Sequence, residues 1–439
     1  MKSALRRINI ETLSLILNSL VREKSLLAVM QVMYARLNRF FQIPLPAFKP
    51  FVVGGPSANR QVLVTDRSKL FWRSPGDPVT VLLRRGVLVV DGQEHECYRN
   101  IMEPLLGPGK LPIYIPQMLR HVDRVSSAWT DGQTVDMLVE SRRIALLIIM
   151  DALFSVDFWD DLPRLWRPIL KSIEFISPGA WIVFPKFPRP GYRQYFRVLD
   201  EYLYAIIKRR RKSDLRHDLL GHLIEAGLDD GLIRDQMLTM LIAGHDTSTA
   251  LLAWTFYLLG MHPEVYSRLQ AEMDLTLQGE PPHTPTGWQP PLLDEVIKES
   301  LRLYPPIHLG NRRVSESIDI DGNSVPAGER LIYSIYLTHR DPAIWEDAGF
   351  FKPERFARGS KHPPYAYVPF GGGPRACIGA AFGQAEARLV LGRLLQTHTF
   401  QIMQPRVHAH MGATLEPRPG VLMKVQRRSA MNNLESPSG

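Results

Sequence analysis

An apolar run at positions 233–261 restricts the fold more than any other part of the chain. The run, IRDQMLTMLIAGHDTSTALLAWTFYLLGM, is apolar on nearly every side of a helix, which is typical of a helix buried inside a large protein. Its length also reaches that of a membrane span, but His245 and Asp246 near its middle argue against burial in lipid. The rest of the 439-residue chain must therefore surround this helix, and we expect a large, mainly helical body.

The middle of this helix has an unusual composition for a buried segment. Gly244 weakens a helix, and the Thr247 hydroxyl can donate to the Ala243 carbonyl, which loosens the backbone hydrogen bonds. A groove of this kind would let a small ligand reach the backbone, and the adjacent Asp246 and Thr247 could pass protons there. A solvated helix junction with an incidental threonine is the alternative at this point.

The remaining sequence predicts a single unit that is mainly α with small β-sheets (α+β). Helical patterns cover residues 93–275 and 378–397, whereas QVLVTD after Arg60 and residues 400–427 are typical of strands. The segment IDIDGNSVPAGERLIYSIY predicts a hairpin that turns at a glycine. We expect three parts along the chain: a helical, partly amphipathic extension at 1–48, the main unit at 49–427, and a disordered tail at 428–439.

Charge and cysteine content restrict the partners and the compartment. The net charge is +9 and no nucleic-acid-binding module is visible, so the excess of Lys and Arg indicates either an acidic protein partner or ordinary solubility. Two cysteines, Cys97 and Cys377, are too few for a disulfide framework and are typical of a reducing cytoplasm. The basic N-terminal segment is too interrupted for a spanning helix, although it could attach to a membrane surface. We expect a cytoplasmic monomer.

The segment FGGGPRACIG surrounds Cys377 with glycines, a proline and an arginine. A helix pattern follows Cys377, and the unpaired N–H groups at a helix start stabilise a thiolate. Gly371 and the next two glycines permit a tight turn that a flat ligand can approach, Gly379 lets the helix start pass close to it, and Arg375 can pair with an anion. A lone thiolate is a poor zinc site and a good axial ligand for haem iron, with a structural cysteine or a catalytic nucleophile as alternatives.

These residues carry a resemblance to a known family. Phe370, Gly373, Arg375, Cys377 and Gly379 stand as FxxGxRxCxG, which resembles the haem-binding signature of the cytochrome P450 family. Three further segments resemble other motifs of that family in the same order: AGHDTS the oxygen-activating helix, ESLR the ExxR motif, and FKPERF the PERF element. The resemblance covers most of the chain. It implies the cytochrome P450 fold, a single triangular-prism-like unit with a long central helix, and haem b with Cys377 as the axial thiolate.

The resemblance also implies how the cysteine segment is held in place. Glu299 and Arg302 lie three residues apart on a helix and share one face, and a buried pair of this kind needs a further polar partner. By resemblance this partner is Arg355, and the triad has a structural role.

Haem carries two propionates, and their burial requires cationic donors. By resemblance the donors are His95, Arg99, Arg375 and Arg312. We prefer Arg312 to its neighbour Arg313, and we expect Cys97 to be an inert, buried thiol. The remaining residues expected to border the haem are Phe370, which would shield the sulfur, together with Gly371, Gly379, Ala243 and Gly244.

The activity implied by the resemblance is insertion of one oxygen atom of O2 into a C–H or C=C bond. Thr247 is expected to hold the oxygen and steer protons, and Asp246 to connect that site to solvent. No reductase is fused, so we expect electrons from a separate carrier, such as an acidic ferredoxin or flavodoxin with its reductase. The alternatives are a peroxide-dependent haem-thiolate hydroxylase or isomerase, and a non-enzymatic haem sensor or carrier; the intact Asp246–Thr247 pair favours the monooxygenase.

Position within the family also implies the walls of a substrate pocket. These walls are mainly apolar and indicate a lipid-like substrate, either a fatty acid, a terpenoid or a polyketide. His308 is the one polar side chain expected to touch it, and the loop at 176–187 could form a lid or meet a membrane. The implied pocket residues are Ile307, His308, Leu309, Ala243, Gly412 and Ala413.

Overall fold

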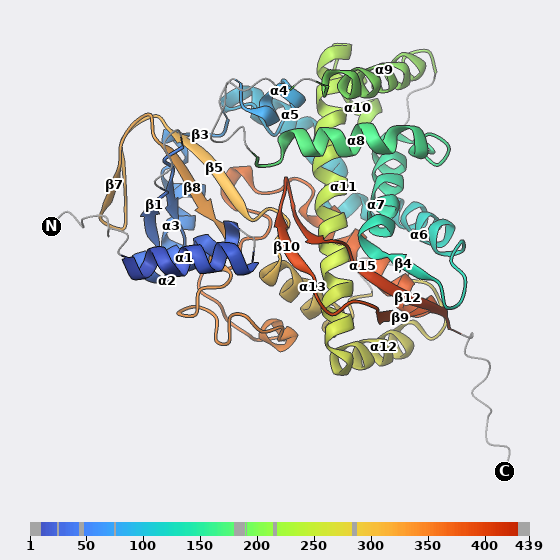
Figure 1. Cartoon of the computed structure of the whole chain (residues 1–439). Helices are drawn as coiled ribbons and strands as arrows, with labels where there is room; N and C mark the ends of the chain where they lie inside the picture. Colours follow the sequence, from blue (N-terminus) through green and yellow to red (C-terminus); the bar gives the residue numbers. More distant parts are fainter. Residues whose placement is uncertain are drawn as a thin grey trace.

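The protein, here a computed structural model, is built around helix α11 (Asp230–Met261), which crosses the whole molecule (Figure 1). The helix predicted at 233–261 is therefore confirmed. It begins where the Asp229 side chain accepts the Leu232 N–H, and it ends before the His262–Pro263 step, where a helix is disfavoured. The structure describes residues 10–23, 26–43, 48–73, 76–179, 189, 191–213, 217–282 and 288–428.

Most of the other helices lie around α11 and make the fold mainly α, as expected (Figure 1). Their bounds are α1 (Ile10–Glu23), α2 (Leu26–Leu37), α3 (Pro56–Arg60), α4 (Pro78–Leu83), α5 (Gly92–Leu106), α6 (Leu111–Ser126), α7 (Met137–Phe154), α8 (Leu162–Ile176), α9 (Arg193–Arg210), α10 (Leu219–Glu225), α12 (Pro263–Leu277), α13 (Pro291–Leu303), α14 (Ile335–Thr338) and α15 (Ala380–Thr397).

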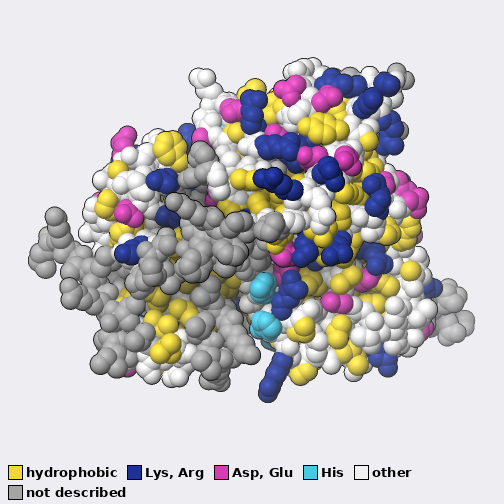
Figure 2. Space-filling model, turned by 45° about the horizontal axis from the view of Figure 1, so that its top comes forward, with side chains coloured by type: hydrophobic (Ala, Val, Ile, Leu, Met, Phe, Trp, Pro, Cys, Tyr) yellow, Lys and Arg dark blue, Asp and Glu magenta, His cyan; other side chains and the backbone are white. Residues whose placement is uncertain are grey.

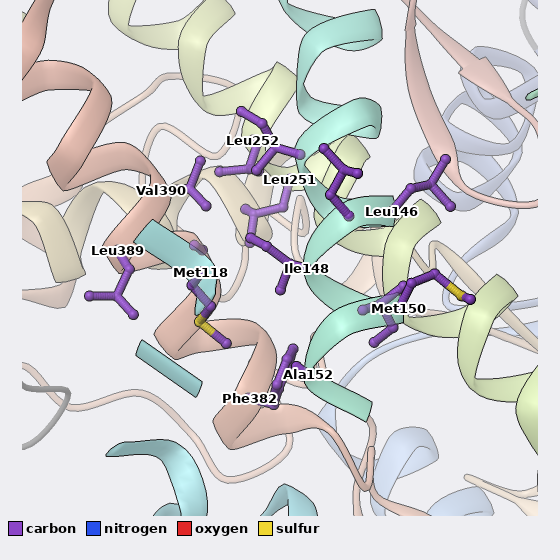
Figure 3. Packing of buried hydrophobic residues seen from close by; sticks show 14 of the residues in the cluster. Met118, Leu146, Ile148, Met150, Ala152, Leu251, Leu252, Phe382, Leu389 and Val390 are labelled. Atoms are coloured by element: carbon purple, nitrogen blue, oxygen red, sulfur yellow. The ribbon is translucent and has the colours of Figure 1, made fainter. Parts of the chain in front are cut away.

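The core beside the candidate site lies among α6, α7, α11 and α15 (Figure 3). Ile148 of α7 and Leu251 of α11 point toward each other there, and Met118 and Phe382 extend the same cluster. Each fully buried side chain of this size contributes on the order of 2 kcal/mol. These contacts fix α11, which carries the predicted residues Ala243, Gly244, Asp246 and Thr247, and α15, which directly follows the cysteine loop.

Small sheets complete the α+β fold. A five-stranded sheet lies to one side with α1 and α2 (Figure 1), and its strands run in the order β1 (Phe40–Gln42), β2 (Phe51–Val53), β8 (Arg330–Ser334), β5 (Leu309–Val314) and β3 (Leu70–Phe71). β2 and β8 are parallel, and the other pairs are antiparallel. The remaining sheets are β4 (Thr134–Asp136) with β12 (Leu422–Arg427) and β9 (His398–Ile402); β10 (His408–Met411) with β11 (Leu415–Arg418); and β6 (Ile318–Ile320) with β7 (Asn323–Val325).

Two expectations about strands have opposite outcomes. The hairpin is confirmed, because Asp321 and Gly322 connect β6 to β7 with φ values of 51° and 80°, as a tight two-residue turn requires. The strand expected at QVLVTD is wrong, since residues Gln61–Thr65 continue α3 as a helical turn. Val62 and Leu63 are buried there on a helical spacing, so tertiary packing overrides the β-propensity of the segment.

The N-terminal region is more closely joined to the body than the expected extension at 1–48. α2 buries Met30, Met33 and Tyr34 against the five-stranded sheet, and β1 pairs with β2 across the expected boundary at residue 48. Of the expected tail only Arg428 is described; residues 429–439 lie outside the described part of the chain. No helix among the described residues has both the length and the apolar character needed to cross a bilayer.

Candidate active site

Cys377 lies in a tight loop that precedes α15. The Cys377 N–H donates to the Phe370 carbonyl at 2.8 Å, and Gly371 and Gly373 have φ values of 72° and 65°. Only glycine adopts such values readily. A Cβ at Gly373 would also collide with the Leu63 carbonyl, so these two glycines are required by the loop and its packing.

Gly379 differs from the glycines of the loop. It caps α15 with a φ of −93°, which any residue can adopt. A Cβ built there would meet no atom of the described chain within 4 Å. The structure therefore leaves open space beside Gly379, as expected for a position that a ligand approaches.

The Cys377 thiol has exposed surface, although protein atoms surround it closely enough to desolvate it. Burial raises the pKa of the thiol, and the Gly379 N–H and the positive charge of Arg99 oppose the rise. Cys377 lies just before a helix, as expected, since α15 begins at Ala380 and its cap residue Gly379 supplies the N–H that lowers the pKa. A cation bound at the sulfur would lower the pKa of the thiol and favour the thiolate.

One face of α11 is open at the predicted oxygen site. Ala243 is exposed and Thr247 is half-buried, although this helix is otherwise mostly buried. The predicted bond is present, since the Thr247 hydroxyl donates to the Ala243 carbonyl at 2.8 Å. Gly244 has a different role from the one expected, because a Cβ there would lie 2.7 Å from the Ile149 side chain of α7. Gly244 permits close helix packing, and α11 continues through it without a break.

Asp246 is buried and does not itself reach solvent. Arg142 of α7 donates to one carboxylate oxygen at 3.2 Å, and the Thr414 hydroxyl donates to the other at 2.8 Å. Arg142 also pairs with Glu416, which accepts from the half-exposed Arg418 at 3.0 Å. A chain of charged groups thus leads from Asp246 to the surface.

A second buried acid lies beside this site. The Ser248 hydroxyl donates to Glu386 of α15 at 2.6 Å, and burial raises the pKa of Glu386 to about 8. His245 is also buried, and burial lowers its pKa to about 3, so it is neutral. Sequence reasoning missed Glu386, whose one visible signal is an acidic residue inside the apolar pattern of α15.

Glu299, Arg302 and Arg355 form one buried cluster. Arg302 donates to both carboxylate oxygens of Glu299 at 2.7 and 2.8 Å, and Arg355 donates to the same carboxylate at 3.1 Å. The remaining Arg302 N–H groups donate to the carbonyls of His339, Ala348 and Phe350. The cluster therefore fixes the segment that leads to the cysteine loop, and its charges are met within the protein.

The predicted propionate donors also lie close together, but one of them, Arg312, has no acid partner among the described residues. Arg312 is 5% exposed whereas Arg313 is exposed, so Arg312 is the inward residue of the two. Arg312 donates to the Asn311 carbonyl at 2.8 Å, and no carboxylate of the described residues forms an ion pair with it. Arg375 pairs with Asp91 at 2.7 Å.

The remaining two donors lie on α5, as the four-residue spacing predicts. Arg99 donates to the Ala376 carbonyl at 2.7 Å and pairs with Glu103 at 3.0 Å. Burial and then the charges of Arg375, Arg99 and Arg67 lower the pKa of His95 to about 4. Burial likewise lowers the pKa of Arg375 to about 10, and Arg312 adds to the effect. Positive charge therefore remains in excess in this cluster, where Arg312 has no carboxylate partner among the described residues.

The expected substrate-pocket residues divide into two groups. Ile307 is 40% exposed, whereas His308 is 4% exposed and its Nδ1 lies 3.4 Å from the Pro306 carbonyl oxygen. Leu309 is half-buried. His308 is therefore turned into the protein, because successive side chains of an extended segment point to opposite sides. Ile307 therefore has exposed surface, whereas His308 is enclosed by the protein.

Three further expectations concern the surroundings of the site. Gly412 is buried and Ala413 is half-buried in the turn between β10 and β11, where the Ala413 N–H donates to the Ser177 hydroxyl at 2.9 Å. Residues 180–187 of the expected lid at 176–187 lie outside the described residues. Cys97 is exposed, so the expectation of a buried thiol is wrong.

The residues present fit a haem group. Cys377 supplies a thiol with exposed surface, Gly379 has open space beside it, and α11 is uncovered at Ala243. Arg312, which has no carboxylate partner among the described residues, could pair with a haem carboxylate, and the N–H groups of Arg375 and Arg99 are further donors. A planar dianionic ligand with a metal centre would satisfy the sulfur and the arginines together.

Comparison with known proteins agrees with this chemistry. The family model described as cytochrome P450 matches residues 10–424. The chain is 30% identical to cyclooctat-9-en-7-ol 5-monooxygenase of Streptomyces melanosporofaciens, over 80% of each chain, and 29% identical to pentalenene oxygenase of Streptomyces avermitilis, over 77% of this chain and 79% of the relative. The crystal structure of the cytochrome P450DA haem domain is similar with a TM-score of 0.83 at 25% identity, over 92% of this chain and 93% of that one. This protein belongs to the cytochrome P450 family and is a haem-thiolate monooxygenase.

Proposed function

We propose that this monooxygenase oxidises an apolar, terpenoid-like substrate with electrons from an acidic carrier protein, and that Cys377, Thr247 and Asp246 carry the chemistry. The observation that supports the assignment of residues is the combination of an accessible thiol at Cys377 with an open α11 face at Ala243 and Thr247. The reducing cytoplasm is the proposed compartment, because both cysteines are free thiols.

When bound, haem supplies the iron that binds and activates O2, and a thiolate ligand favours O–O cleavage. Thr247 would present its hydroxyl at the open face of α11 and deliver a proton there. Asp246, held by Arg142 and Thr414, would exchange that proton with Thr247, while Arg142 and Arg418, which cannot accept a proton, would hold the carboxylates of Asp246 and Glu416 in place. The roles of these residues are positioning and proton transfer.

Replacement of Thr247 by alanine tests this assignment. We expect Thr247→Ala to keep consuming O2 and the electron donor while forming several-fold less product per O2, because water and protons then reach the site without control. Thr255→Ala is the matched control, since its hydroxyl makes the same bond to the Leu251 carbonyl at 2.8 Å on the same helix. Equal coupling of product to O2 in both variants would contradict the role of Thr247.

The substrate proposal rests on apolar surface and on two relatives. Ile307 and Ala413, the accessible members of the expected pocket, are apolar, and His308 is withdrawn from it. Pentalenene oxygenase and cyclooctat-9-en-7-ol 5-monooxygenase are named for an unsaturated hydrocarbon and an unsaturated alcohol. Of the three classes that the sequence allows, we therefore favour the terpenoid. The ferric holoenzyme should shift from low to high spin with pentalenene or a similar cyclic hydrocarbon, and a shift only with fatty acids would contradict this choice.

The carrier proposal rests on charge beside the cysteine loop. A cavity of about 310 Å³ is lined by Phe370 and Gly371 of the loop, Lys298 of α13 and Arg388 of α15. An acidic side chain of a carrier would complement Lys298 there. Basic and acidic side chains are also mixed over the face that carries α8 and α9 (Figure 2). The net charge of the protein therefore does not locate the docking site, and the position of each basic residue has to be tested.

Charge reversal distinguishes these positions. We expect Lys298→Glu to raise the apparent KM for an acidic ferredoxin severalfold, and the effect should shrink in high salt. Lys208→Glu on α9 is the control, because Lys208 is exposed on that other face. Equal KM values for the two variants would contradict docking beside Phe370.

Turnover with peroxide and none with O2 and a carrier would instead favour the peroxide-dependent alternative.

A further inference from the structure

Trp72 lies among the cationic residues and was not anticipated from the sequence. It follows β3, and two guanidinium groups lie over its ring: the Cζ of Arg312 is 3.5 Å and the Cζ of Arg375 is 4.8 Å from the ring centroid. Trp72 is not a member of the hydrophobic clusters formed by the described residues. Its ring therefore packs mainly against charge.

This arrangement holds two like charges near each other. Arg312 and Arg375 repel, and an aromatic face attracts each of them through its negative quadrupole. The Trp72 backbone N–H donates to Asp91 at 3.2 Å, and Asp91 also accepts from Arg375 at 2.7 Å. Asp91 thus ties the tryptophan to one arginine, while the ring contacts the other.

The indole N–H supplies the second observation. Trp72 Nε1 is buried, and within the described residues it has no hydrogen-bond acceptor. A buried donor without an acceptor is unfavourable and uncommon in folded proteins. The orphan donor belongs to the side chain that contacts Arg312, which has no carboxylate partner among the described residues, and a carboxylate would satisfy both.

We propose that Trp72 is a further haem-binding residue: its ring contacts and holds both Arg312 and Arg375, and its Nε1–H donates to a haem carboxylate. The inference rests on the haem cofactor of the family and adds a residue that lies outside the α5 pair and the cysteine loop. A packing role for Trp72 at the sheet edge is the alternative to be excluded.

Two variants separate the ring from the N–H. Trp72→Phe keeps an aromatic face and removes the donor, and Trp72→Leu removes both. We expect the holoenzyme to transfer haem to excess apomyoglobin about tenfold faster in Trp72→Phe, as for loss of a hydrogen bond to a charged group, and faster still in Trp72→Leu. The reduction potential of the haem should fall in both variants, because a less neutralised carboxylate favours ferric iron.

Trp159 provides the matched control. It also lies under an arginine, with Arg124 Cζ 4.3 Å from its ring centroid, but it precedes α8, away from the cationic cluster. Trp159→Phe and Trp159→Leu should leave haem transfer and the potential unchanged. Trp72 variants that behave like the Trp159 variants would overturn the proposal, and a Trp72→Phe protein that matches the wild type while Trp72→Leu does not would overturn the donor role. Failure of the wild type to show a thiolate-type spectrum would count against the Cys377 assignment instead.

Discussion

Two clusters of arginines in this protein differ in whether every arginine has a carboxylate partner. In the first, Glu299 accepts from Arg302 and Arg355, and three backbone carbonyls accept the remaining Arg302 N–H groups. In the second, Arg312 has no carboxylate partner among the described residues, and the pKa values of His95 and Arg375 are lowered. The first cluster is complete within the chain and holds the fold. The second has the electrostatics of a binding site for an anion.

The largest predicted effect concerns the balanced cluster. Glu299→Gln leaves Arg302 buried without its acid, and we expect a loss of about 3–5 kcal/mol in the free energy of unfolding, measured with urea on the apo-protein. Glu354→Gln is the control, because its pair with Arg268 at 2.7 Å is half-exposed and worth less than about 1 kcal/mol. Similar losses in the two variants would show that burial does not set the strength of the first cluster.

The unbalanced cluster should respond in the opposite way. In Arg312→Leu, the holoenzyme should lose haem about 10–100-fold faster, as expected for a hydrogen bond to a charged group. The apo-protein should be no less stable than the wild type, since leucine replaces a buried charge that has no acid partner. Arg313→Leu, at the exposed neighbour, should change neither property. If the Arg312→Leu apo-protein were destabilised as strongly as Glu299→Gln, Arg312 would instead stabilise the fold and would not be kept for a ligand.

The third predicted effect is the pH dependence that His95 adds. Its pKa is about 4 in the folded apo-protein against 6.5 for an ordinary histidine, so the unfolded state binds the proton first as the pH falls. The stability of the apo-protein should therefore decline from about pH 6.5 to about pH 4, and His95→Gln should decline less steeply. Other buried histidines contribute equally to both proteins. Identical slopes in urea unfolding would contradict the assigned environment of His95.

The sequence predicted most of what depends on local pattern. The long helix, the hairpin at Gly322 and the α5 spacing of His95 and Arg99 follow from periodicity or turn chemistry. The strand predicted for the short segment after Arg60 was wrong. Its β-branched residues are typical of strands, but the segment forms a helical turn that buries Val62 and Leu63 in the hydrophobic cluster beside the five-stranded sheet.

Contacts between distant residues could not be predicted in this way. Arg142 donates to Asp246, which lies 104 residues away in the sequence, and to Glu416, which lies 274 residues away. No sequence motif links α7, α11 and β11, so the sequence could not predict the chain of charged residues that leads from Asp246 to the surface. The role of Gly244 was missed for the same reason, since its constraint comes from Ile149 on another helix.

The absorption spectrum of the reduced, CO-bound protein tests the central assignment most directly. Cys377 is the residue with the loop, the exposed sulfur and the neighbouring arginines that a haem thiolate requires. The account predicts that the wild-type protein shows the red-shifted Soret band of a thiolate-ligated haem and that Cys377→Ser lacks it. A native wild-type protein with the Soret band of a histidine-ligated haem, or a Cys377→Ser variant that keeps the thiolate band, would contradict it.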